Sequence, residues 1–292
     1  MDRADHNLIY SYSFYLNHMA GQWDALICND YEAIMALPHK RKSFIHYLFQ
    51  PFLTPVLGVF GKNISEDLVS RFINAIPVKF KLRDISLNHF NNVNPGFRDQ
   101  YQRSNYVLSL AASYETIRHS YSENIIRNIS KAEKAGCVLK KDIDIREITA
   151  LCKREWPTFT KIEKGTFEHL TASFCTFSPY STSYGVYRQD GKLLASCVFL
   201  LYAGRAYYWL VGNDPIAKRF GASPLLIDRF IKDHAGTGYL LDFEGSDKKS
   251  IASFYQRFGA VAEPYTTLYQ NFLPFPLNRL KTTPVQYRSL IS

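Results

Sequence analysis

Three side chains near the end of the chain have types and spacing that suit proton transfer. Asp242 and Glu244 stand two residues apart at the end of a short apolar run, and Tyr255 follows them. A strand would place both carboxylates on one face, where either can accept a proton from an amine nucleophile. The Tyr255 phenol can protonate a leaving thiolate. The ordinary alternatives are a helix cap, an ion pair with Lys248 or Lys249, and a tyrosine that fills the core.

A basic loop of small residues precedes these side chains and leads into an amphipathic helix. The pair Ser223-Pro224 predicts the helix start, with Ser223 as its N-cap. Backbone N–H groups, the positive end of the helix dipole and two cations favour a bound phosphate there. The alternative is an ordinary turn with solvated cations. The residues predicted to bind a phosphorylated donor are Lys218, Arg219, Gly221, Ala222 and Ser223.

Periodic apolar residues predict the elements that position these two groups. From Pro224 onward the spacing is helical and places Asp228 on the polar face. Residues 239–244 alternate as a strand, and residues 248–258 form a second helix with Tyr255 on its apolar stripe.

Two helices and a meander of antiparallel strands come earlier in the chain. The helices are predicted at residues 145–155 and 166–177, and the strands lie within residues 183–211, joined by hairpin turns at glycines. On the last of these strands Tyr208 is predicted to line the substrate cleft, with core packing as the alternative.

The first part of the chain repeats the order of strands, helix and strand. Its helix opens with Ser65, Glu66 and Asp67, and these side chains satisfy the helix start and would repel a phosphate. We therefore expect a degenerate N-terminal lobe at residues 1–115, which helps to form the acceptor cleft. The C-terminal lobe, residues 116–292, is expected to hold the donor site.

Two further segments carry clusters of basic residues. Residues 38–42 are predicted to form a basic turn, and residues 114–135 a single helix. Along this helix Arg127, Lys131 and Lys134 form a stripe that suits phosphate binding, although a solvated helix face is the simpler interpretation.

The basic loop and the helix after it resemble the second half of the GNAT acyltransferase fold. GNAT proteins commonly carry [RQ]-x-x-G-x-[GA] in the loop, and this chain has K-R-F-G-A-S at residues 218–223. The later helix resembles their A-x-x-Y-x-x-x-G pattern, in which the tyrosine corresponds to Tyr255. This resemblance implies an acyl-CoA donor such as acetyl-CoA, with Tyr255 protonating the departing thiolate.

A narrower resemblance is to FemAB-type proteins, which have two GNAT-like lobes. Residues 241–246, 254–259 and 127–136 look like their D-F-x-G, F-K-x-x-F-G and R-N-I-R-K-A motifs. FemAB-type enzymes transfer amino acids from aminoacyl-tRNA. Their F-K lysine is Tyr255 in this chain, which moves the expected donor toward acyl-CoA. The resemblance implies a mixed α/β fold of two tandem GNAT-like lobes, each a mostly antiparallel sheet flanked by helices.

Composition limits the partners and the compartment. The net charge is +9 and the pI about 9.2, which favours anionic partners such as cofactor phosphates, nucleic acid or an anionic membrane surface. The five cysteines are scattered, which favours buried thiols in the cytoplasm over disulfides or a zinc site. No metal is expected, and neither a signal peptide nor a membrane span is predicted.

Three functions remain open from the sequence. The first is an N-acyltransferase that moves an acyl group from a CoA-type thioester to a small-molecule or peptide amine bound between the lobes. The second is FemAB-like aminoacyl transfer from charged tRNA, which the net charge of +9 would serve. The third is a non-catalytic double-GNAT scaffold or binding protein, because Lys218 and Ser223 depart from the loop pattern.

Overall fold

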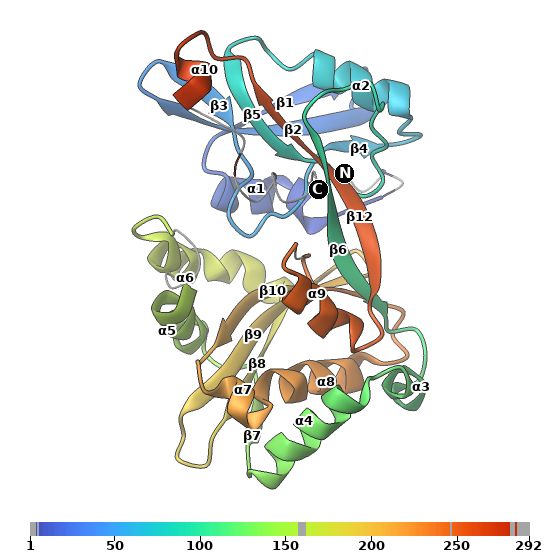
Figure 1. Ribbon diagram of the computed structural model, residues 1–292, viewed down its shortest axis with the longest axis vertical. Coiled ribbons are helices and arrows are strands. Elements are labelled where there is room, and N and C mark those ends of the chain that lie inside the picture. The colour runs from blue at the N-terminus through green and yellow to red at the C-terminus, as the bar shows by residue number, and fades with distance from the viewer. Residues whose placement is uncertain (1–3, 5, 157–161, 246, 281–283, 285–292) are drawn as a thin grey trace. The chain divides into compact units, whose positions relative to one another are not determined.

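A computed structural model describes residue 4 and residues 6–156, 162–245, 247–280 and 284 (Figure 1). The chain is a mixed α/β protein with mostly antiparallel strands, which confirms the expected fold class. It divides into two compact units. Unit 1 comprises Met1–Asn105, Gly245–Asp247 and Ala262–Ser292, and unit 2 comprises Tyr106–Glu244 and Lys248–Val261. The chain therefore passes from unit 1 to unit 2 and returns to unit 1 twice, at Gly245 and at Ala262.

Unit 1 is built on a mostly antiparallel sheet with strand order β1-β2-β3-β5-β12-β6, and β4 pairs with β2. Only the β3–β5 pair among these registers is parallel. The strands are β1 (Trp23–Cys28), β2 (Ala33–Lys42), β3 (Ile45–Leu48), β4 (Val59–Gly61), β5 (Phe80–Ser86), β6 (Gln100–Ser109) and β12 (Val261–Asn271). The helices are α1 (Ser13–Met19), α2 (Glu66–Asn74) and α10 (Leu277–Leu280), with a 3₁₀ turn at Ile9–Ser11.

Helix α2 covers the apolar core of unit 1. Its buried Val69, Phe72 and Ile73 pack with residues of β2, β4 and β5. The helix starts as the sequence predicts, because the Ser65 hydroxyl accepts a hydrogen bond from the Leu68 backbone N–H at 3.2 Å. Glu66 and Asp67 occupy its first turn, so this helix start is negatively charged.

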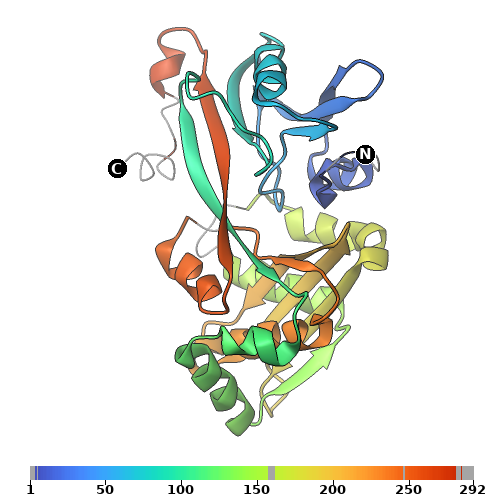
Figure 2. The same ribbon diagram turned by 90° about the vertical axis from the view of Figure 1, so that its right-hand side faces the viewer.

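Strands β6 and β12 are long and lie side by side (Figures 1 and 2). Each has residues assigned to both units, since β6 crosses from unit 1 to unit 2 after Asn105 and β12 crosses back after Val261. Both strands are therefore shared between the two units along the sequence.

Unit 2 is a sheet with strand order β6-β11-β10-β9-β8-β7. Neighbours are antiparallel except β10 and β11, which are parallel. Its further strands are β7 (Val138–Lys141), β8 (Ser181–Tyr187), β9 (Leu193–Tyr202), β10 (Arg205–Asn213) and β11 (Leu240–Asp242). Its helices are α3 (Tyr114–His119), α4 (Glu123–Lys134), α5 (Ile145–Glu155), α6 (Thr166–Phe177), α7 (Ala217–Phe220), α8 (Ala222–His234) and α9 (Lys249–Gln256), with a 3₁₀ turn at Ser178–Tyr180.

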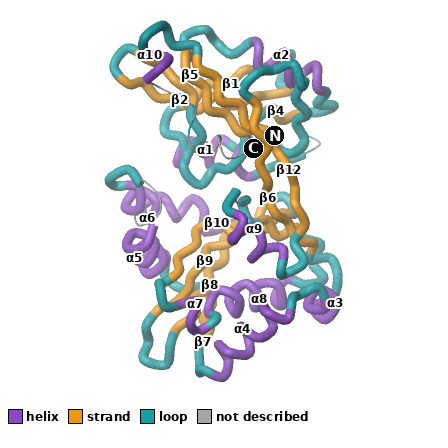
Figure 3. The backbone as a smooth tube through the Cα atoms, in the orientation of Figure 1, coloured by secondary structure: helices purple, strands orange, loops and turns teal. Residues whose placement is uncertain are grey.

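Helices cover this sheet as two groups. Helix α8 packs on β8 and β9 with α4 against it, whereas α5 packs on β9 and β10 with α6 against it (Figure 3). The ring of Phe230 on α8 stacks on Phe199 of β9 at 3.7 Å between centroids. Trp209 of β10 instead contacts Phe177 of α6, at 5.2 Å. Neighbouring strand residues point to opposite faces, so one helix group covers each face.

Two sequence predictions about basic segments are wrong. Residues 38–42 continue strand β2, where Pro38 pairs with β1 and residues 39–42 pair with β3, instead of forming a turn. The single helix predicted at residues 114–135 is broken into α3 and α4. The break lies at Ser122, whose hydroxyl caps α4 and whose backbone N–H donates to the Arg257 carbonyl. The stripe of Arg127, Lys131 and Lys134 is exposed on α4, as the simpler interpretation expected.

Buried polar groups correct two further expectations. Asp228, predicted on the polar face of α8, is buried and accepts hydrogen bonds from the Tyr114 hydroxyl at 2.9 and 3.1 Å. All five cysteines are free, but only Cys152 and Cys197 are buried, and Cys175 is exposed. Among the described residues, no helix is long and apolar enough to cross a membrane.

Candidate functional site

Residues 218–223, predicted to bind the donor and called the donor loop below, lie at the junction of two helices. Short helix α7 ends at Gly221, which adopts a left-handed conformation with φ of 72°, and α8 begins at the next residue. The predicted N-cap is therefore wrong. Gly221 occupies that position without a side-chain cap, and the hydroxyl of Ser223 donates to Asn213 Oδ1 at 2.6 Å. Pro224 is the third helical residue and not the first.

Close packing explains why the loop needs glycine at position 221. A Cβ atom there would lie 2.1 Å from the backbone oxygen of Asn128 on α4, which is closer than any real contact. The positive φ independently favours glycine. Helix α4, which carries the R-N-I segment, thus packs directly behind the donor loop. The sequence resemblance had named both motifs, but it did not predict that they touch.

The start of α8 is electrically positive. Its first turn holds no acidic residue and no side-chain cap, so the N–H groups of Ala222 and Ser223 have no helical acceptor. Lys218 and Arg219 are exposed beside it, and no acidic side chain in the described part of the chain pairs with either. Helix α2 of unit 1 has the opposite character, with two carboxylates in its first turn. An anion is therefore favoured at α8 and disfavoured at α2.

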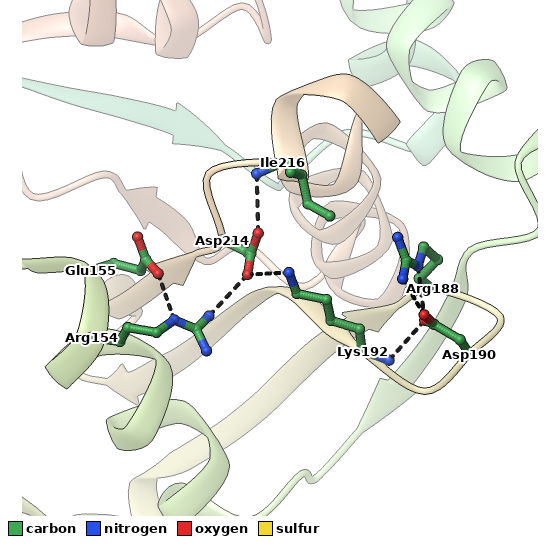
Figure 4. Close-up of polar contacts among 7 residues, drawn as sticks. All are labelled: Arg154, Glu155, Arg188, Asp190, Lys192, Asp214 and Ile216. Carbon is green, nitrogen blue, oxygen red and sulfur yellow. Dashed lines mark hydrogen bonds and ion pairs between the residues drawn. The ribbon is translucent and has the colours of Figure 1, made fainter.

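Asp214 anchors the segment that leads into this loop (Figure 4). Its buried carboxylate accepts from the Ile216 backbone N–H at 3.1 Å, and it pairs with Arg154 at 2.9 Å and Lys192 at 3.0 Å. Burial raises the pKa of Asp214, but the Ile216 hydrogen bond and the charges of Lys192 and Arg154 outweigh it and hold the pKa below its ordinary value. Helix α5, the turn before β9 and the loop are thereby tied to one charged group.

The two predicted carboxylates occupy different environments. Asp242 ends β11, is buried, and pairs with the guanidinium of Arg205 at 2.7 Å. Glu244 lies beyond the strand, with a positive φ of 59°, so the predicted alternation does not extend to it. The second carboxylate oxygen of Asp242 accepts from the Glu244 backbone N–H at 2.7 Å and holds this turn. Glu244 is less buried than Asp242.

Tyr255 lies in an aromatic cluster next to these carboxylates. Its ring stacks on Phe243 with centroids 4.4 Å apart, and Tyr208 and Tyr106 meet it at 6.4 and 6.3 Å. Burial, followed by the negative charge of Glu244, raises its pKa above the ordinary phenol value. The phenol therefore carries its proton at neutral pH, as a general acid must before the reaction.

Tyr208 is predicted to line the substrate cleft, and the structure places it among these rings. It is 5% exposed, and its ring also contacts Phe199 and Phe243. Burial raises its pKa well above the ordinary phenol value. Tyr208 is thus brought together with Tyr255, whereas its role toward a substrate stays a prediction.

Strands β10 and β11 pair over a short length and then separate. Their parallel pairing covers only Arg205–Tyr207 against Leu240–Asp242, while β10 continues to Asn213 along β9. A bulge interrupts the β10–β9 register at Trp209, which bends the strand at this point. Beyond the bulge, the Val211 carbonyl accepts from the indole N–H of Trp156 at 2.8 Å. Past Tyr207 the edge of β10 is thus no longer paired with β11, and the Trp156 indole occupies one of its carbonyls.

Several residues of this site escaped the sequence analysis. Arg205 and Asp214 are the partners that fix Asp242 and the donor loop, and Asn213 holds Ser223. Each lies next to a turn, at Gly204 or before Pro215, which is the only local signal. Among the described residues, no group of three or more His, Cys, Asp or Glu side chains is arranged to hold a metal ion.

Comparisons with known proteins identify the domain that carries the site. Residues 119–250 match the family model of the acetyltransferase (GNAT) domain, which includes the donor loop and both carboxylates and ends before Tyr255. This match over residues 119–250 agrees with the GNAT resemblance that the sequence motifs predicted, and the fold is similar to that of a FemAB-like protein, FemX. A comparison with curated protein sequences finds no significant match.

Solved structures share the fold at low sequence identity. FemX superposes with a TM-score of 0.64 at 11% identity over 95% of each chain. L-PGS from Bacillus licheniformis gives 0.54 at 12% identity, over 91% of this chain and 90% of that one. A GCN5-related N-acetyltransferase from Kribbella flavida gives 0.50 at 11% identity, over 91% and 96%. At these identities the similarity establishes the fold alone, and the class of the matched domain, residues 119–250, is that of a GNAT acetyltransferase domain.

Proposed function

We propose that this protein is an N-acyltransferase that moves an acyl group from a CoA-type thioester to an amine. The observation that carries the proposal is the uncapped, positively charged start of α8 beside Lys218 and Arg219, within the residues that match the GNAT domain. A donor pyrophosphate is an anion that fits this helix start. We place the rest of the donor along the edge of β10 beyond its pairing with β11.

The residues near Glu244 fit the proton transfers that acyl transfer requires. In the proposed step the amine nitrogen bonds to the thioester carbonyl carbon and the carbon–sulfur bond breaks. Glu244 accepts the amine proton, because the carboxylate of Asp242 is held by Arg205. Tyr255, whose phenol is protonated before the reaction, donates its proton to the thiolate. The acceptor, a small-molecule or peptide amine, stays a prediction.

Release of free CoA tests this proposal. The protein is incubated with acetyl-CoA and a panel of primary amines, and thiol release is followed together with the mass of the acylated amine. We expect release that depends on the amine and falls strongly in Glu244→Gln. The matched control is Glu163→Gln, which removes a carboxylate from a loop of unit 2 remote in sequence from the site. Binding of acetyl-CoA without transfer to any amine would instead favour a non-catalytic binding protein.

Aminoacyl transfer from charged tRNA is the second candidate, and a separate observation favours it. Arg127, Lys131 and Lys134 are exposed along α4, which packs against α7 and the donor loop. The structural similarity to FemX over 95% of both chains is consistent with it. Binding of tRNA through such a surface weakens steeply with salt, because each neutralised phosphate releases counterions. Tight tRNA binding lost in Lys131→Ala/Lys134→Ala, without acetyl-CoA binding, would favour this candidate.

A further inference from the structure

Several strands of unit 1 start or finish at the same end of its sheet. The end of β2 pairs with the start of β3, with Lys42 opposite Ile45, and the start of β3 lies beside the start of the parallel strand β5. The end of β12 lies beside the start of β5, because the two strands are antiparallel. The side chain of Asn271 donates to the Asn278 carbonyl at 3.1 Å, which ties α10 to this end. We name this end of the sheet, residues 41–45, 78–81 and 271–279, the basic end.

Large apolar side chains are exposed at the basic end. Phe44, at the tip of the β2–β3 hairpin, is 73% exposed, and Val78, before β5, is 76% exposed. Beyond β12, Phe272 is 53% exposed and Phe275 is 72% exposed. Val78 and Phe272 border the same depression of the surface. A gathering of exposed apolar side chains from three chain segments is typical of an interaction surface.

Positive charges accompany these apolar side chains. The cations next to them are exposed, namely Arg41 and Lys42 before Phe44, Lys79 after Val78, and Arg279, which lies over the Phe275 ring at 5.3 Å. Two carboxylates also lie toward this end. Asp24 pairs with Lys79 at 3.2 Å, and the Asp99 carbonyl accepts from the Tyr269 backbone N–H of β12. The cations outnumber these carboxylates, so the basic end favours an anionic partner.

The opposite end of the same sheet is acidic. The β1–β2 hairpin turns there, β4 ends beside it with Gly61 opposite Ala33, and α2 begins soon afterwards. In Figure 1, α2 and β4 lie on one side of unit 1, and β3 and α10 lie on the other. The acidic side chains at this end are exposed, namely Asp30, Glu32, Glu66 and Asp67. Both ends of β2 thus expose an aromatic ring, but carboxylates flank Tyr31 and cations flank Phe44.

We propose that the basic end docks on the surface of a lipid bilayer that contains anionic lipids. Its cations lie among the negative headgroups, and its exposed apolar side chains enter the boundary between headgroups and acyl chains. A bilayer suits this surface because it presents negative charge directly above an apolar layer. A nucleic acid would pair with the cations but would leave Val78 without an apolar partner. All these residues belong to unit 1, so docking does not use the donor loop of unit 2.

Co-sedimentation of the full chain with lipid vesicles tests the proposal. Vesicles of phosphatidylcholine alone are compared with vesicles of equal parts phosphatidylcholine and phosphatidylglycerol. We expect binding to the anionic vesicles to be at least about tenfold tighter, because each cation near the surface gains from the negative potential. Added salt should weaken this binding by screening. Equal binding to both kinds of vesicle, or binding to neither, would overturn the proposal.

The two hairpin tips of β2 provide a matched pair of aromatic variants. Phe44→Ser should weaken binding to the anionic vesicles about tenfold, because the ring no longer leaves water. Tyr31→Ser removes a similarly exposed ring, 67% exposed, from the acidic end and should bind as the native chain does. Equal binding by Phe44→Ser and the native chain would overturn the proposal, because adsorption through charge alone needs no apolar contact.

A second pair of variants tests the charges. Arg41→Gln/Lys42→Gln should weaken binding to the anionic vesicles about tenfold or more. Its matched control, Lys62→Gln/Lys164→Gln, removes two exposed charges, one from beside the acidic end and one from unit 2, and should stay near the native affinity. Equal weakening in both double variants would show that the net charge of the chain, and not the basic end, directs binding, and would overturn the assignment of this surface.

Discussion

The guanidinium of Arg205 donates to the carboxylate of Asp242 across 2.7 Å, and both side chains are buried. Arg205 begins β10 and Asp242 ends β11, so this pair joins two parallel strands next to the point where they separate. Because of this ion pair, Asp242 and Glu244 have different roles, although they are only two residues apart in the sequence. Asp242 pairs with Arg205 and holds the backbone of the turn, and Glu244, which follows in a left-handed conformation, is the proposed base.

Asp242→Asn should therefore mainly lower stability, whereas Glu244→Gln should mainly lower turnover. Asp242→Asn leaves Arg205 buried without its counter-charge and should lower the free energy of unfolding by about 3–5 kcal/mol. Glu244→Gln should leave stability nearly unchanged and lower turnover by about 10²–10⁴-fold. Denaturant unfolding and steady-state rates measure the two effects. Full turnover in Glu244→Gln would contradict its role as the base.

The sequence predicts those parts of the site that depend on local signals, and it misses contacts between residues that are far apart along the chain. Helices α5 and α6 have the predicted bounds, residues 145–155 and 166–177, because caps and periodicity are local signals. The prediction of Ser223 as N-cap fails because Gly221 packs on Asn128, far away in the sequence. The Arg205–Asp242 pair and the anchoring of Asp214 are likewise contacts between distant segments. The structural role of Asp242 therefore cannot be recognised from the sequence, because its partner Arg205 is supplied by the fold.

Tyr255→Phe tests the proton donor without disturbing the cluster. Phenylalanine preserves the stacking on Phe243, so stability should change little. Turnover should fall by about 10²-fold or more while the KM for the donor stays the same. Because the pKa of Tyr255 is raised, its proton remains available at high pH, and the native rate should not fall up to about pH 10 on its account.

Tyr208→Phe is the control for that experiment, since it removes a neighbouring phenol of the same cluster. Its turnover should stay within a few-fold of the native value if Tyr255 alone supplies the proton. A Tyr255→Phe variant with native turnover would remove the proton-donor role and leave Tyr255 as a core residue.

Gly221→Ala should damage the donor loop more than a glycine substitution of equal backbone strain. Both Gly221 and Gly236 have a positive φ, but only at Gly221 would a Cβ meet a backbone oxygen, that of Asn128 at 2.1 Å. Gly236→Ala should cost about 1–2 kcal/mol of unfolding free energy from strain alone. Gly221→Ala should cost more and also weaken donor binding. Equal losses of unfolding free energy in both variants would show that α4 can move away from residue 221 at little cost.

The stability contributed by Asp214 should depend on pH with a definite sign. Its pKa is held below the ordinary value in the folded state, so its contribution is present above the unfolded pKa of about 4 and lost as pH falls through the folded value. The difference in unfolding free energy between the native chain and Asp214→Asn should be full at pH 7. It should shrink below about pH 4. A difference that is independent of pH would contradict the charged network of Figure 4.

The central claim is that residues 218–223 seat the pyrophosphate of a CoA-type donor, and calorimetric titration with acetyl-CoA tests it most directly. The account predicts saturable binding by the native chain and a loss of at least about tenfold in Lys218→Ala/Arg219→Ala. The matched control, Lys131→Ala/Lys134→Ala, removes the same charge from α4 and should bind acetyl-CoA as the native chain does. Absence of binding by the native chain, or equal weakening in both double variants, would contradict the claim.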